Sequence, residues 1–125
     1  MQRKLTPEEE FLLMAICANA DPVDGEWGPT DEHRMRWIDS IRTAHVTREC
    51  GCGSCPSFEI GHDTDPNAHL NPLKGPANTV LSAYDHGGYA EIFLHISDNT
   101  VWDLDIAPPG DGIAVPLPTT EMLSF

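Results

Sequence analysis

The residues of this sequence best suited to chemistry are its cysteines, because three of the four fall within six residues. Cys50, Cys52 and Cys55 follow a Cys-x-Cys-x-x-Cys spacing, with glycine at positions 51 and 53. Thiolates are preferred ligands of structural zinc, and a tight turn containing glycine lets short side chains converge on one ion. The first hypothesis is therefore a structural Zn²⁺ at this cysteine turn.

A tetrahedral zinc site requires a fourth ligand. His62 is the first candidate, so the predicted metal ligands are the three clustered cysteines and His62; the next candidates for the fourth position are His45, Cys17 and His69. The paired Cys-x-x-Cys knuckles that are typical of zinc modules are absent. Two other interpretations of the cysteine turn therefore stay open.

In the second interpretation, Cys52 and Cys55 form a thiol redox pair. Such a pair normally opens a helix whose N-terminus lowers the thiol pKa, whereas Phe58 to Ile60 has the pattern of a strand. In the third interpretation, cysteine and glycine are simply small residues that allow close packing in a turn. The three interpretations predict a metal, a redox reaction and no chemistry, respectively.

The run from Arg48 to Ser57 also carries a resemblance. It resembles a group of small uncharacterised bacterial proteins with a Cys-x-Cys-Gly-x-Cys-Pro-Ser strand between N-terminal helices and a C-terminal β-meander. The closing Pro116-Leu117-Pro118 is similar to that group as well. The resemblance implies a fold and no particular activity.

The charge of the chain limits its partners. Seven basic residues stand against twenty acidic ones, a net charge of −13, and no Lys or Arg follows Lys74. A phosphate backbone attracts clustered Lys and Arg, so direct binding to nucleic acid or to an anionic membrane is disfavoured. The acidic excess favours a protein partner with a basic surface. An alternative is mimicry of nucleic acid, as an inhibitor of a DNA-binding protein of phage or mobile-element type.

The amino end does not have the pattern of an export signal. Three glutamates, Glu8 to Glu10, directly precede a short apolar run, which is the wrong charge for a signal peptide. No stretch reaches the roughly 18 apolar residues of a membrane span. We therefore expect a cytoplasmic protein whose cysteines are reduced thiols or metal ligands.

Two helices are expected in the first third of the chain. Thr6 and Glu9 form a capping box around Pro7, which predicts a helix running to about Asn19. A second helix is expected to begin near Thr30. The residues expected to face the core are Phe11, Leu12, Ala15, Ile16 and Cys17 in the first helix, and Met35, Trp37, Ile38, Ile41 and Ala44 in the second.

Strands are expected after position 44. The clearest signals are three β-type runs at 79–84, 89–96 and 100–106, joined by turns at His86-Gly87-Gly88 and Asp98-Asn99, and the second and third runs alternate. Trp102, Leu104 and Ile106 are expected to face the core, and Glu91, Asp103 and Asp105 to form a row of carboxylates on the exposed face, with His95 among them.

These elements predict one α+β domain over residues 1–125. Its two N-terminal helices are expected to pack on one face of an antiparallel sheet of about four or five strands, with the cysteine turn at one edge. The leading functional hypothesis is a non-enzymatic acidic module that binds a protein, with a structural zinc as an optional addition. A thiol redox protein and a nucleic-acid mimic are the alternatives.

Overall fold

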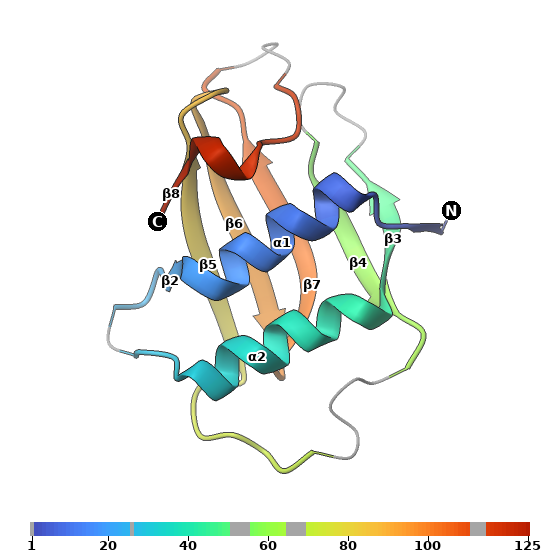
Figure 1. The fold of residues 1–125 in the computed structure, drawn as a ribbon, viewed down its shortest axis with the longest axis vertical. Helices are drawn as coiled ribbons and strands as arrows, with labels where there is room; N and C mark the ends of the chain where they lie inside the picture. The colour runs from blue at the N-terminus through green and yellow to red at the C-terminus, as the bar shows by residue number, and fades with distance from the viewer. Residues whose placement is uncertain (1, 26, 51–55, 65–69, 111–114) are drawn as a thin grey trace.

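A computed structural model describes residues 2–25, 27–50, 56–64, 70–110 and 115–125. Within these residues, eight strands form one antiparallel sheet and two α-helices cover one of its faces (Figure 1). The strand order is β1-β3-β4-β7-β6-β5-β2, with β8 also paired to β5. The helices are α1 (Pro7–Asn19) and α2 (Asp31–Ser40), with short 3₁₀ helices η1 (Ile41–Thr43) and η2 (Thr120–Met122). The strands are β1 (Arg3–Lys4), β2 (Asp21–Pro22), β3 (Ala44–Glu49), β4 (Phe58–His62), β5 (Asn78–Asp85), β6 (Ala90–Ser97), β7 (Thr100–Ala107) and β8 (Leu123–Ser124).

The prediction of four or five strands behind an N-terminal helix pair is wrong. The sheet has eight strands, β1 precedes α1, and β2 lies between the two helices. The three additional strands, β1, β2 and β8, contain two residues each. A strand of two residues cannot show an alternating pattern, so these strands depend on the pairing partner that the fold supplies. Short edge strands of this kind also limit edge-to-edge aggregation.

The capping box at the start of α1 is present and is extended by an arginine. The Thr6 backbone N–H donates to Glu9 Oε1 (2.8 Å), and the Glu9 N–H donates to Thr6 Oγ1 (3.1 Å). Arg3 on β1 donates to both carboxylate oxygens of Glu9, at 2.8 and 2.9 Å. Burial raises the pKa of Glu9, but the hydrogen bonds from Arg3 and Thr6 outweigh it and hold the pKa below its ordinary value.

The buried faces of the two helices differ from the expected ones at two large residues. Phe11 is 61% exposed and Met35 is 64% exposed, although both were predicted to face the core. Leu13 is fully buried instead. The run from Phe11 to Met14 is apolar on every side of the helix, so its periodicity does not define which face is buried.

The loop before β5 and the turn between β6 and β7 are both tied to α2, whose N-cap is Thr30. His33 Nδ1 accepts a hydrogen bond from the Thr30 backbone N–H (3.0 Å), and His33 Nε2 lies 2.7 Å from the Lys74 carbonyl. Trp37 is fully buried and donates from Nε1 to Asn99 Oδ1 (3.0 Å). These contacts hold α2 across the end of the sheet.

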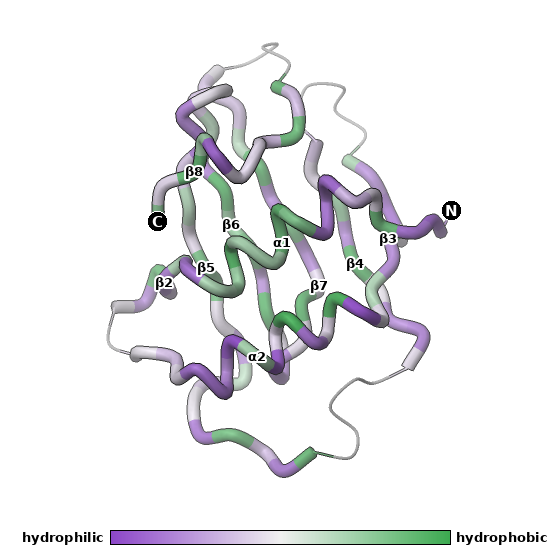
Figure 2. Tube along the Cα trace, in the orientation of Figure 1, coloured by the Kyte–Doolittle hydropathy of each residue, from purple (hydrophilic) through white to green (hydrophobic). Residues whose placement is uncertain are grey.

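Strands β5, β6 and β7 form a meander whose inner face meets the helices. Buried apolar residues alternate with more exposed ones along β4 and β6, and β5 and β7 contribute further buried apolar residues to the same face. Figure 2 colours the strands by the hydropathy of each residue. The inner residues are Phe58, Ile60, Leu81, Ile92, Leu94, Ile96, Val101, Leu104 and Ile106. None of the described helices covers the opposite side of the sheet in Figure 1, and this side is called the outer face below.

Candidate metal centre

A row of charged side chains crosses four neighbouring strands on the outer face. Arg48 on β3 is paired with Glu59 on β4, Glu59 with Asp103 on β7, and Asp103 with His95 on β6. Directly paired residues of an antiparallel sheet project from the same face, with Cβ atoms about 5 Å apart. The sheet therefore brings together four groups that lie up to 55 positions apart in the sequence.

A β-bulge determines which residues of β7 belong to this row. Ile96 is paired with Val101, and the next pair is His95 with Asp103, so Trp102 is the extra residue. Trp102 is 44% exposed and its ring centroid lies 5.4 Å from that of His95. The prediction that Trp102 faces the core is wrong, because the bulge turns Val101 inward in its place.

Three of the outer-face side chains converge on one point. His95 Nε2 lies 2.9 Å from Asp105 Oδ2 and 3.9 Å from Asp103 Oδ2. The three potential metal-ligand atoms, one from each residue, lie within 4.8 Å of one another. Two ligand atoms bound to the same zinc ion are about 3.3 Å apart, given bonds of about 2.0–2.1 Å and a tetrahedral angle. Small rotations of these side chains would therefore suffice to surround one ion.

Ionising both aspartates of the cluster at the same time is unfavourable. Burial, the nearby Asp105 carboxylate and, to a smaller extent, Glu59 raise the pKa of Asp103 to about 6, while His95 acts in the opposite direction. Only 18% of the Asp103 side chain is exposed, compared with 52% for Asp105. A cation at this position would stabilise the ionised form of Asp103 and relieve its repulsion from Asp105.

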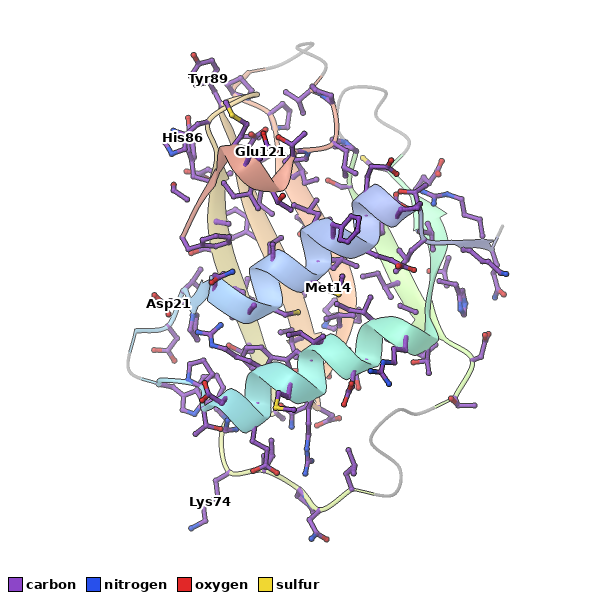
Figure 3. The ribbon with its side chains drawn as sticks, in the orientation of Figure 1. Met14, Asp21, Lys74, His86, Tyr89 and Glu121 are labelled. Atoms are coloured by element: carbon purple, nitrogen blue, oxygen red, sulfur yellow. The ribbon has the colours of Figure 1, made fainter. Side chains whose placement is uncertain are left out.

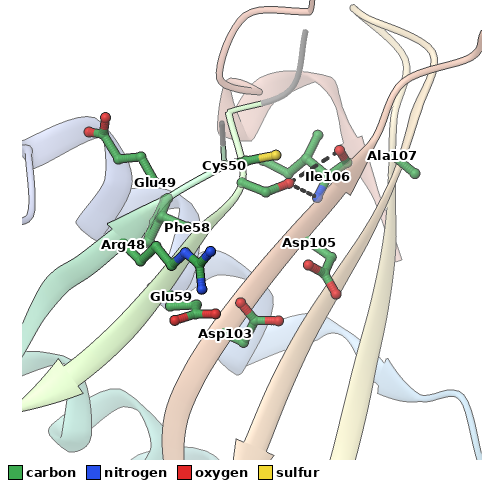
Figure 4. A pocket seen from close by; sticks show the side chains of 10 residues that line it. Arg48, Glu49, Cys50, Phe58, Glu59, Asp103, Asp105, Ile106 and Ala107 are labelled. Carbon is green, nitrogen blue, oxygen red and sulfur yellow. Dashed lines mark hydrogen bonds between the residues drawn. The ribbon is translucent and has the colours of Figure 1, made fainter. Parts of the chain in front are cut away.

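An open cavity of about 500 Å³ adjoins the two aspartates (Figure 4). Its walls come from the ends of β3 and β4 and from β7, so it provides space for solvent or a small ligand next to the cluster. The lining residues that carry polar or charged side chains are Arg48, Glu49, Cys50, Ser57, Glu59, Asp103 and Asp105.

The structure does not bring together the two described members of the metal site predicted from the sequence. The Cys50 N–H donates to the Ser57 carbonyl at one end of the β3–β4 pair, whereas His62 ends β4 opposite the first residue of β3. Five residues of strand from Ser57 to His62 span about 17 Å. Cys52 and Cys55 lie outside the described residues, so zinc or redox chemistry at the cysteine turn stays a prediction.

His62 has a structural role in this arrangement. Its Nδ1 lies 2.8 Å from Thr43 Oγ1, and its Nε2 lies 2.6 Å from the Val101 carbonyl. Both ring nitrogens therefore have hydrogen-bond partners, and the ring links η1 and β4 to β7. A metal bound here would have to replace one of these two hydrogen bonds.

Two of the other three candidates for a fourth ligand, Cys17 and His45, are described by the structure, and neither lies at Cys50. Cys17 is fully buried in the core, and burial raises the pKa of its thiol far above the ordinary value, which disfavours the thiolate. His45 lies near the His62 end of the hairpin, with Nδ1 3.5 Å from Asp63 Oδ1. His69 lies outside the described residues.

Sequence reasoning placed His95 among carboxylates but did not predict a metal site there. The available signal was the Asp103-x-Asp105 pair, whose side chains share one face of a strand, close to a histidine across a short turn. A regular hairpin around Asp98-Asn99 would pair His95 with Trp102. Only the bulge brings Asp103 to that position.

Comparison with known proteins gives no further guidance to the site. No protein-family model, no curated protein and no solved structure matches the chain. The resemblance based on the cysteine run therefore stays a prediction. Among the described helices, none is both long enough and apolar enough to cross a membrane.

Proposed function

We propose that this protein binds a divalent metal ion on the outer face of its sheet, with His95, Asp103 and Asp105 as the protein ligands. The observation that carries the proposal is the convergence of one imidazole nitrogen and two carboxylate oxygens within 4.8 Å. These side chains come from two strands of a hydrogen-bonded sheet, β6 and β7, which restricts their relative movement.

One imidazole nitrogen and two carboxylate oxygens together favour a first-row transition-metal ion. Imidazole suits zinc and iron, whereas sites for magnesium and calcium are built from oxygen ligands. Three protein ligands leave at least one coordination position of Zn²⁺ for water or a ligand oxygen. In this fold that position would open toward the cavity, where Arg48 supplies a positive charge for an anionic ligand.

The test is a zinc titration that separates this site from the cysteine turn. Isothermal titration calorimetry with ZnCl₂ at pH 7.5 is made on the metal-free protein, on Asp103→Asn/Asp105→Asn, and on Cys50→Ser/Cys52→Ser/Cys55→Ser. We expect the aspartate variant to bind zinc at least about tenfold more weakly, because a neutral amide replaces each charged ligand. The cysteine variant is expected to retain the affinity of the wild-type protein.

Glu91→Gln is the matched control, because Glu91 is an exposed carboxylate on β6 that does not belong to the cluster. It is expected to leave zinc affinity unchanged within about twofold. Loss of binding in the cysteine variant alone would assign the metal to the cysteine turn and refute the proposal. Absence of zinc binding by the wild-type protein would refute both assignments.

A further inference from the structure

A second cavity lies on the opposite side of the molecule, between the first turns of α1 and the C-terminal segment. It measures about 470 Å³ and is called the α1 groove here. Its lining residues are Thr6, Glu8, Glu9, Phe11, Leu117, Pro118, Thr119 and Thr120. Figure 1 shows the C-terminal segment passing over the helix-covered side of the sheet beside α1.

The groove presents an apolar side chain that the fold leaves unpacked. Phe11 is 61% exposed, although the neighbouring Leu12 and Leu13 are fully buried in the core. Across the groove, Leu117 is partly buried and packs against the core, and Pro118 is buried. An apolar side chain inserted between Phe11 and Leu117 would remove apolar surface from water on both walls.

The rim of the groove is acidic, and neither wall supplies a cation. The helix Pro7–Asn19 and the segment 115–125 contain no Lys or Arg. Glu8 lines the groove and is exposed, and Glu121, which directly follows the lining residue Thr120, is exposed as well. Figure 3 shows Glu121 above α1 and Lys74 at the opposite end of the molecule.

The nearest arginine is already engaged. Arg3 forms ion pairs with Glu9 at 2.8 Å and with Glu49 at 2.7 Å, so its charge is compensated within the fold. The groove therefore has an apolar residue on each wall, Phe11 and Leu117, and exposed carboxylates at its edge. Charge complementarity selects a ligand that has one bulky apolar side chain flanked by basic residues.

We propose that the α1 groove docks a segment of a partner protein in which a bulky apolar side chain stands between lysine or arginine residues. The apolar side chain inserts beside Phe11 and Leu117, and the basic residues pair with Glu8 and Glu121 at the edge of the groove. This inference is independent of the metal centre, because the groove shares no lining residue with the cluster on β6 and β7.

The test uses a capped synthetic peptide, Lys-Lys-Leu-Trp-Lys-Lys, titrated into the ¹⁵N-labelled full chain and followed by NMR. We expect saturable shift changes at Phe11 and at residues 117–120, and we expect them to weaken as salt is raised, because rim charges are screened. Phe11→Ala is expected to weaken the affinity about tenfold, since it removes the apolar wall. Glu8→Gln/Glu121→Gln is expected to weaken it severalfold and to reduce the salt dependence.

Met35→Ala is the matched control, because Met35 is an equally exposed apolar residue on the other helix. It is expected to bind the peptide as the wild type does, and the acidic peptide Glu-Glu-Leu-Trp-Glu-Glu is expected to cause no shifts. The proposal is overturned if saturating shifts appear on the outer face, around Glu59 and Asp105, in place of the groove. Equal affinities for Phe11→Ala and Met35→Ala, or no saturable shifts up to millimolar peptide, would overturn it as well.

Discussion

Replacing Asp103 with asparagine is expected to stabilise the metal-free protein at pH 7.5, by about 2 kcal/mol. The pKa of Asp103 is raised from 3.8 to about 6, chiefly by burial and by Asp105. A shift of this size corresponds to about 3 kcal/mol of unfavourable ionisation in the folded state, and partial solvent access at the cavity lowers the expected effect. The neutral amide keeps the shape of the side chain and removes the charge.

The sign of the pH dependence follows from proton linkage. Between pH 4 and pH 6, the folded state binds more protons at Asp103 than the unfolded state does, so stability falls as pH rises through this window. Below pH 4 the carboxyl is protonated in both states and the penalty is absent. The stabilisation by Asp103→Asn is therefore expected to be near zero at pH 4 and complete above about pH 7.

The measurement is urea unfolding followed by circular dichroism at several pH values, with a chelator present. Glu91→Gln removes a carboxylate from the same face without entering the cluster, and it is expected to change the free energy of unfolding by less than about 0.5 kcal/mol. A stabilisation by Asp103→Asn that is the same at pH 4 and pH 7.5 would contradict this account. A destabilised variant at pH 7.5 would contradict it too. A carboxylate whose ionised form destabilises the folded state is typical of a functional site, where activity is gained at a cost in stability.

Replacing Trp37 with alanine is expected to lower the free energy of unfolding by about 3–5 kcal/mol. Trp37 is fully buried between α2 and the sheet, and its indole N–H donates to Asn99 Oδ1 at 3.0 Å. The substitution creates a large cavity and also removes the hydrogen-bond donor of Asn99. Because α2 contributes few other fully buried side chains, the loss is expected to detach this helix from the sheet.

A second substitution at this position and a control at Trp102 separate packing from hydrogen bonding. Trp37→Phe keeps an aromatic ring and loses the donor, so its expected loss is about 1–2 kcal/mol. Trp102→Ala is the matched control, because Trp102 is 44% exposed on the outer face, and its expected loss is below about 1 kcal/mol. Equal losses for Trp37→Ala and Trp102→Ala in urea unfolding would contradict the assignment of these residues to opposite faces.

Local signals predicted the regular elements well where the signal spans several residues. The capping box at Thr6 and Glu9 marks the start of α1, and the Asp98-Asn99 turn lies between β6 and β7, where both residues adopt positive φ. Helix caps and two-residue turns are formed by neighbouring residues, so a sequence can specify them without knowledge of the fold.

The width of the sheet and the face of Trp102 were predicted incorrectly for a different reason. Strands of two residues, such as Arg3–Lys4, have no periodicity of their own and form only where a neighbouring strand presents its edge. The bulge at Trp102 shifts the pairing of β6 and β7 by one residue, and it brings Val101 to the core face in place of Trp102. Such features arise from packing between distant segments and leave no local signal.

The sequence by itself determined the strong negative charge, the caps and turns, and the alternation that buries one face of β6 and places Leu104 and Ile106 of β7 in the core. The sequence placed His95 on the same face as the carboxylates of Asp103 and Asp105, and the tertiary structure decided which titratable groups come into contact. It separated Cys50 from His62 by the length of β4, and it placed His95 beside Asp103 and Asp105 through strand pairing and one bulge. Sequence spacing reports which side chains a single strand can present on one face. Contact between strands depends on their register. The register is set when one face of the whole sheet packs against its helices.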